Sequence, residues 1–242
     1  MELQKLIGTQ GISCASRKMH LKLTFAACLF VWLNCPFYIE LSSAAFSQEP
    51  PAVVLRRGTQ LIDSGRLQDA LSVFQGFTRS RPSDGRGYFW MGVCYDEMGN
   101  YLAATQAYHD GLSKAEQSGM DSSEMRMNLG NVLLKQNQID LAIEAFQRAL
   151  EINPAYGLAA LNLGRAYIAK GDYNSALASF EKCKELRFYV RQLPYYKAKA
   201  LLGLGKNDEA ASLIKRLLQD LPEGSAKQEI VQEFQSCLNS QK

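Results

Sequence analysis

One spacing constrains this chain more than any other feature. Alanine recurs at intervals of 34, 38, 34 and 34 residues, and a large apolar or aromatic residue follows each alanine four positions later. The pairs are Ala70 with Phe74, Ala104 with Tyr108, Ala142 with Phe146, Ala176 with Phe180 and Ala210 with Ile214. A fixed period of this length is typical of a solenoid, in which each repeated unit contacts only its neighbours.

Further columns run in phase with the alanines and indicate paired helices. A small residue is followed three positions later by a larger one, which suits two close-packed helices because the small residue lets a neighbouring backbone approach. The small column is Gly58, Gly92, Gly130, Gly164 and Ala198, and the larger column is Leu61, Tyr95, Leu133, Tyr167 and Leu201. Turn-forming residues then end the first helix at Gly65, Gly99, Gly171 and Gly205 and the second at Pro82, Pro154 and Pro222.

These columns together resemble the tetratricopeptide repeat: small at the eighth place, aromatic at the eleventh, alanine at the twentieth, aromatic at the twenty-fourth and proline at the thirty-second. The resemblance implies an all-α fold, a right-handed superhelical solenoid of five helix-turn-helix repeats. The repeats span residues 51–84, 85–118, 123–156, 157–190 and 191–224. The third unit fits best, through Asn128–Asn131, Ala142–Ala149 and the closing Asn153–Pro154.

The chain departs from the family pattern at a few positions. No unit has tryptophan at the fourth place, and Trp90 stands two positions beyond it in unit two. Glu116 and Phe188 replace the closing proline of units two and four, and four extra residues, 119–122, separate units two and three. After the fifth unit, residues 225–242 form a predicted capping helix and tail, since Ile230, Phe234, Cys237 and Leu238 share one helical stripe.

The first 47 residues have a different composition and predict a secretory signal. Basic residues at 17, 18 and 22 precede an apolar run over 23–33, and small residues follow over 42–47. A positive flank, a short apolar core and a small-residue exit are the features of a signal peptide. We therefore expect export to the periplasm or cell envelope, or secretion, with cleavage after Ala45 or Ser47.

Two other interpretations of this segment remain open. The eleven-residue apolar run is shorter than the roughly twenty residues of a spanning helix, but extended over residues 21–39 it would form an uncleaved membrane anchor. An internal helix is the remaining alternative. Met19 is a candidate for the true start, because a chain that begins there has a leader of conventional length.

Charge and cysteine usage exclude several classes of function. From Gln48 onwards the chain has 23 lysines and arginines against 22 aspartates and glutamates, whereas a nucleic-acid-binding domain shows a basic stripe. The same balance predicts no membrane-surface patch. Cys94, Cys183 and Cys237 are far apart and form no Cys-x-x-Cys pair, so neither a zinc site nor a redox motif is predicted.

The sequence also predicts no catalytic site. His109 is the only histidine after the leader, and the neighbouring carboxylates Asp96 and Glu97 diverge on a helix. No grouping supplies a nucleophile, a base and an orienting residue. We expect a non-enzymatic protein without a cofactor or a metal ion.

In the tetratricopeptide repeat family, the first helices of successive units line a concave groove. The resemblance therefore implies that the fifth and ninth places of each unit face a partner. The fifth places are Leu55, Phe89, Met127, Leu161 and Tyr195, and the ninth places are Thr59, Val93, Asn131, Arg165 and Lys199. The first column is apolar throughout, while the second becomes more polar and ends in two cations.

Such columns suit an extended or helical peptide. The side chains of the peptide would pack on the apolar column. Asn131 would form a hydrogen bond with the peptide backbone, and Arg165 would pair with a carboxylate of the peptide. Alternatively, the asparagines are generic repeat chemistry and the cations are solvated. The subclass that captures chaperone tails is disfavoured, because it needs lysine at the fifth place where unit three has Met127.

The leading hypothesis is an exported scaffold or adaptor in the cell envelope that holds a protein or peptide partner in this groove. It would bind no nucleic acid and would meet a membrane only through an uncleaved N-terminal segment. The alternatives are a structural or self-associating component that uses its convex face, and an accessory subunit of an envelope enzyme.

Sequencing the N-terminus of the mature protein tests the export prediction. We expect the mature chain to begin at Phe46 or Gln48, because cleavage requires small residues before the cut. Recovery of Met1 on soluble cytoplasmic protein would contradict export.

Overall fold

The computed structural model describes residues 49–188, 190 and 192–220, together with 224, 228, 230–232, 234 and 236. The predicted leader, residues 1–47, lies outside the described residues. The chain divides after Pro50, and every helix considered below belongs to the second unit, Pro51–Lys242. No helix within the described ranges is both long enough and apolar enough to cross a membrane.

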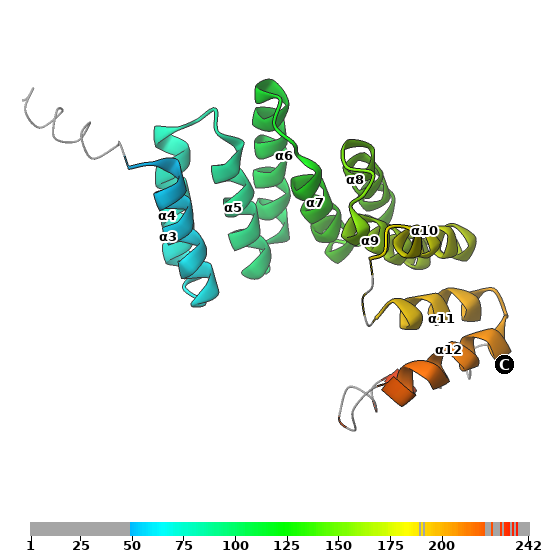
Figure 1. Ribbon diagram of the computed structural model, residues 1–242. Helices are drawn as coiled ribbons and strands as arrows, with labels where there is room; N and C mark the ends of the chain where they lie inside the picture. The colour runs from blue at the N-terminus through cyan, green and yellow to red at the C-terminus, as the bar shows by residue number, and fades with distance from the viewer. Residues whose placement is uncertain are drawn as a thin grey trace, which may run out of the picture. The chain divides into compact units, whose positions relative to one another are not determined.

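The described part of the second unit is built of helices and contains no strand (Figure 1). The first helix of each pair is α3 (Pro51–Asp63), α5 (Gly85–Glu97), α7 (Ser123–Lys135), α9 (Gly157–Lys170) and α11 (Leu193–Gly203). The second helix is α4 (Leu67–Ser80), α6 (Tyr101–Ser118), α8 (Ile139–Ile152), α10 (Tyr173–Glu185) and α12 (Asn207–Asp220). Each helix packs against the one before and the one after it in sequence. The predicted all-α solenoid of helix-turn-helix repeats is therefore confirmed.

An aromatic ring seated on a glycine holds each of the first four helix pairs together. The ring comes from the second helix and is almost completely buried, while the glycine is the small residue of the first helix. A Cβ atom added at the glycine would lie 2.2 to 2.6 Å from the nearest ring carbon, which is closer than atoms can pack. The pairs are Gly58 with Phe74, Gly92 with Tyr108, Gly130 with Phe146 and Gly164 with Phe180.

The turn inside each pair requires one residue with a left-handed backbone. Gly65, Gly99, Gly171 and Gly205 adopt φ values between 73° and 83°, which cost glycine little. In unit three the same place is held by Asn137 at φ 60°, and asparagine tolerates this region better than most other residues.

Phe188 shows how unit four closes without its proline. The backbone leaves α10 through Arg187 at φ 53°, and the Phe188 amide donates a 2.9 Å hydrogen bond to the Cys183 carbonyl. The Phe188 ring then packs on Gly157 at the start of α9, where a Cβ atom would lie 2.3 Å from the ring. A partly buried ring thus takes the place of proline as the feature that ends the unit.

The extra residues between units two and three lengthen a helix. α6 has 18 residues, whereas the other second helices have 13 or 14, and it ends at Gly119 with φ 67°. The chain then turns through Asp121, whose carboxylate accepts a 2.8 Å hydrogen bond from the Ser123 amide. The insertion therefore adds about one turn to α6 before α7 begins.

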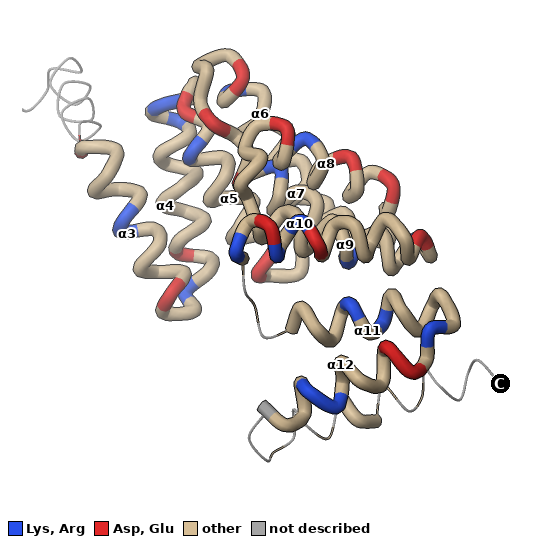
Figure 2. The backbone as a smooth tube through the Cα atoms, turned by 45° about the vertical axis from the view of Figure 1, so that its right-hand side comes forward, with Lys and Arg blue, Asp and Glu red and all other residues tan. Residues whose placement is uncertain are grey.

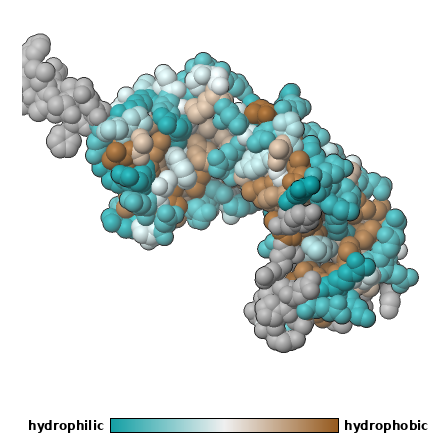
Figure 3. Space-filling model, in the orientation of Figure 1, coloured by the Kyte–Doolittle hydropathy of each residue, from teal (hydrophilic) through white to brown (hydrophobic). Residues whose placement is uncertain are grey.

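Buried apolar side chains run through the stack of helices. One cluster extends from Ala104 in unit two to Ala200 in unit five, and a second fills unit five around Leu201 and Ile214. The outer surface in Figure 3 is mainly hydrophilic, with small separate hydrophobic patches. Most of the predicted capping segment lies outside the described residues, but Phe234 is helical and buried in the second cluster.

Two glycine-to-alanine changes test the ring-on-glycine packing. Gly164→Ala should lower the free energy of unfolding by about 1–3 kcal/mol, because the methyl group overlaps the Phe180 ring. The matched control is Gly76→Ala in α4, where no atom lies within 4 Å of the added Cβ. That change should raise stability by about 0.5–1 kcal/mol, since alanine favours a helix more than glycine. If urea unfolding gives the same change in the free energy of unfolding for both variants, the ring-on-glycine packing is contradicted.

Candidate functional site

The first helices bring the predicted binding residues onto neighbouring elements. α7 contacts α9, and α9 contacts α11, although each pair is separated in sequence by a second helix. Residues at the same place of successive units therefore lie side by side along these helices. We call the surface formed by the fifth and ninth places the first-helix face.

The fifth-place column is not equally accessible along this face. Leu55, Phe89 and Tyr195 are half-buried, so part of each side chain reaches solvent. Met127 and Leu161 are only 5% and 7% exposed and belong to the main core cluster. The apolar contact surface is therefore confined to units one, two and five, while units three and four offer polar groups.

A chain of hydrogen bonds links units three and four on the first-helix face. Asn131 Nδ2 donates to the Met127 sulfur at 3.2 Å, and Asn162 Nδ2 donates to Asn131 Oδ1 at 3.0 Å. The Arg165 guanidinium donates to Asn162 Oδ1 at 3.0 Å. Asn162 is 3% exposed, and these bonds satisfy its amide, as a buried polar group requires.

Tyrosine rings of unit five support both cations of the ninth-place column. The Arg165 guanidinium lies 5.3 Å from the centre of the Tyr196 ring, and Lys199 Nζ lies 5.5 Å from that of Tyr195. The two rings meet edge to face at 5.4 Å, and Tyr196 also stacks on the buried Phe180. Cation–π attraction and packing together restrict where the Arg165 head group can lie.

The first helices of units four and five, α9 and α11, contain positively charged residues and no negatively charged ones. α9 contains Arg165 and Lys170, and the charged residues of α11 are Lys197 and Lys199, shown in blue with no red on α11 in Figure 2. Lys170 pairs with Asp140 at 2.8 Å, and Lys197 pairs with Glu181 at 2.6 Å. Arg165 is exposed and pairs with no carboxylate in the described ranges.

Units one and two present a different surface. Phe89 meets Trp90 edge to face at 5.0 Å, and Trp90 stacks on Phe74 at 6.0 Å. Asp96 forms a 2.6 Å ion pair with Lys135, which ties α5 to α7. This end of the first-helix face is thus aromatic, and the charges of Asp96 and Lys135 neutralise each other.

Comparison with known proteins agrees with this arrangement. Sequence models described as tetratricopeptide repeat match residues 55–118, 123–156 and 159–188, which together make up more than half of the chain. The chain belongs to the tetratricopeptide repeat family. The match over residues 123–156 has the same bounds as the third repeat predicted from the sequence.

A curated relative shares this repeat region. The human DnaJ homolog subfamily C member 3 is 27% identical over 180 residues, which cover 66% of this chain. That alignment covers only 34% of the human protein, so this chain spans about a third of its length.

Solved tetratricopeptide repeat structures share the fold. MamA from Desulfovibrio magneticus RS-1 superimposes with a TM-score of 0.62 at 18% identity, over 69% of this chain and 93% of MamA. YrrB, described as a TPR protein with an unusual peptide-binding site, gives a TM-score of 0.60 at 20% identity, over 74% and 90%. At such identities the likeness concerns the fold alone.

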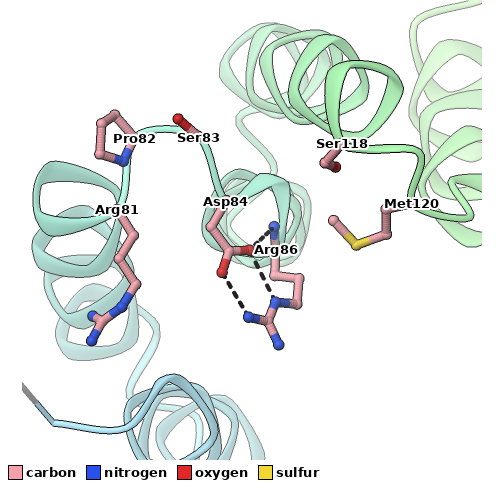
Figure 4. Close-up of a pocket in the computed structure, with 7 residues that line it drawn as sticks. All are labelled: Arg81, Pro82, Ser83, Asp84, Arg86, Ser118 and Met120. Atoms are coloured by element: carbon pink, nitrogen blue, oxygen red, sulfur yellow. Dashed lines mark hydrogen bonds and ion pairs between the residues drawn. The ribbon is translucent and has the colours of Figure 1, made fainter.

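A hollow of about 590 Å³ lies beside the turn that joins the first two tetratricopeptide repeats (Figure 4). Asp84 caps the start of α5 there and accepts two hydrogen bonds, 2.7 and 2.9 Å long, from the Arg86 guanidinium. The hydrogen bonds from Arg86 hold the pKa of Asp84 below its usual value. Ser118 and Met120 line the opposite side. Because Arg86 and Asp84 satisfy each other, this hollow is less suited to a charged ligand than the first-helix face.

The described cysteines are poor reactive groups. Cys94 and Cys183 are free and completely buried, and burial raises the pKa of the Cys94 thiol to about 11. A thiol of that pKa is almost entirely protonated at neutral pH and is a weak nucleophile. Within the described ranges, no group of three histidine, cysteine, aspartate or glutamate residues is placed to hold a metal ion.

Sequence reasoning selected Asn131, Arg165 and Lys199 but missed two residues that hold them. Asn162 and Tyr196 both occupy the sixth place of their units, one position beyond the predicted fifth-place column. A polar residue at Asn162 amid an otherwise apolar stretch, Gly157–Leu163, was the available signal. Whether these residues contact a partner remains a prediction.

Proposed function

We propose that this chain is a protein-interaction scaffold that holds an acidic peptide segment on the first-helix face of units three to five. Tetratricopeptide repeat proteins bind protein or peptide partners, and YrrB is a structural neighbour described by its peptide-binding site. The acidic character of the partner is our inference from the charges of α9 and α11.

Arg165 is the observation that carries this proposal. Its guanidinium is held by Asn162 and by the Tyr196 ring, yet it faces solvent without a carboxylate partner in the described ranges. An arginine held in place loses less side-chain entropy on binding than a mobile one. Its planar donors match a carboxylate bidentately, which gives both affinity and orientation.

The remainder of the face favours a segment bound lengthwise. Asn131 presents a partly exposed amide near Arg165, and Tyr195 offers a partly exposed ring at the next unit. Phe89 and Trp90 provide an aromatic surface at the other end. A peptide with an acidic residue at units four and five and apolar side chains towards unit two would contact every part.

We further propose that the protein is non-enzymatic and exported. Tetratricopeptide repeat folds are in general interaction modules, and the buried thiols described above are unsuited to nucleophilic chemistry. The export proposal depends on the basic flank, apolar run and small-residue exit of residues 1–47. The envelope is the compartment in which we expect the partner, with anchoring through residues 21–39 as the alternative.

A second candidate function is self-association through the second helices. Leu102 and Leu141, on α6 and α8, are large apolar side chains that are 77% and 52% exposed. Light scattering of the mature chain separates the two functions, since a structural component would form larger assemblies as its concentration rises.

Replacing Arg165 and Lys199 together with glutamate tests the acidic-peptide proposal. In a pull-down from envelope extract, the double variant should lose at least tenfold of its bound partner, because the new carboxylates repel an acidic segment. The matched control is Lys182→Glu with Lys184→Glu on α10, which changes the net charge equally. Full retention of every partner by a folded Arg165→Glu, Lys199→Glu variant would contradict the proposal.

A further inference from the structure

A second cavity lies on the side of α7 that faces away from the first-helix face. It has a volume of about 350 Å³ and is lined by α6, α7 and α8, with α7 between the other two (Figures 1 and 2). Its lining from α7 is Arg126, Leu129 and Leu133. At 100° per residue these positions point about 150° away from Met127 and Asn131, so opposite sides of α7 contribute to two different surfaces. We call this cavity the second-helix groove.

The floor of the second-helix groove is apolar and its rim is polar. Leu112, Leu129, Leu133 and Ala145 are nearly buried and form the floor, while the more exposed lining residues are Thr105, His109, Ser113, Gln138, Glu144 and Arg148. Leu141 stands at the edge with half of its surface exposed. An apolar floor inside a polar rim is the usual composition of a protein-binding groove.

The extra turn of α6 closes one end of this groove. It carries Glu116, whose carboxylate accepts a 2.5 Å hydrogen bond from the Arg126 guanidinium. The Nε of Arg126 is buried and donates no hydrogen bond to any described residue. The Arg126 side chain as a whole is 21% exposed, and a guanidinium has donors enough to pair with a partner's carboxylate as well as with Glu116.

The length of the groove suits a short helix. Its α6 wall runs from Thr105 to Glu116, about 16 Å at 1.5 Å per residue, which is three helical turns. A strand would find no partner there, because the helices around it satisfy their own backbone groups and present no sheet edge. A helix needs only apolar side chains for the floor and polar ones for the rim.

We infer that the second-helix groove binds an amphipathic helix of a partner protein. The helix has apolar side chains at i and i+3 or i+4 that contact Leu129 and Leu133, and a carboxylate that accepts from the Arg126 guanidinium. This site is independent of the first-helix face. A chain that uses both would join two partners across the thickness of unit three.

Site-specific photo-cross-linking on the full chain, in the cells that produce it, tests the inference. Benzoylphenylalanine replaces Leu141 at the groove edge, and in a matched control it replaces Leu102, which is more exposed but does not line the groove. Mass spectrometry should map the Leu141 cross-link to one segment with apolar residues at helical spacing and an aspartate or glutamate. The control should not reach that segment. A cross-link to a second copy of this chain, to a segment without that pattern, or to nothing would overturn the inference.

Two arginine variants test the carboxylate contact with a synthetic peptide of the cross-linked segment. Arg126→Met keeps the apolar stem and removes the guanidinium, and should weaken binding at least tenfold. Arg148→Met changes the charge equally on the rim and should weaken it less than threefold, because Arg148 is exposed and paired with Glu151. Unchanged thermal midpoints establish that both variants fold. Equal losses, or loss of the cross-link in the Arg165→Glu, Lys199→Glu variant, would refute a separate site.

Discussion

An aromatic ring pressed onto a glycine is the interaction on which this structure depends. Because the glycine has no Cβ atom, the second helix of a unit approaches the first closely enough for its ring to fill the space between them. Gly130 with Phe146 and Gly164 with Phe180 repeat this contact at corresponding places in adjacent units. Because the same contact recurs in each unit, the helix pairs have similar geometry, and similar pairs stack in register. Residues far apart in sequence therefore line up on one face.

That alignment explains how repeated helix pairs build specific surfaces. Asn131 and Asn162 are 31 positions apart but hydrogen-bond at 3.0 Å because their helices are neighbours in the stack. The Arg165 side chain is then held from two helices, by Asn162 of α9 and by the Tyr196 ring of α11. On the other side of the same repeat, the extra turn of α6 places Glu116 against Arg126. One solenoid thus presents two faces of different chemistry, as an adaptor between two proteins requires.

The sequence predicted the helix pairs well, because the small and aromatic columns encode contacts within one unit and repeat every 34 residues. It predicted the surface less well, since exposure depends on side chains from neighbouring units. Met127 and Leu161 occupy places that face the groove in the family, yet both are buried in the main core cluster. In the sequence, Phe188 was only a replacement for the closing proline, and the spacing of residues could not predict that its ring packs on Gly157. The contact of Arg165 with the Tyr196 ring likewise joins two units, so the pattern within one repeat could not predict it.

Nuclear magnetic resonance of the mature chain measures the central contact directly. The Hα proton of Gly164 that points where a Cβ atom would stand should lie against the Phe180 ring, and those of Gly92 and Gly130 against their own rings. The account predicts nuclear Overhauser effects between these protons and the rings, with Hα shifts displaced by the ring current. Hα signals at ordinary helical shifts, without contacts to the rings, would contradict it.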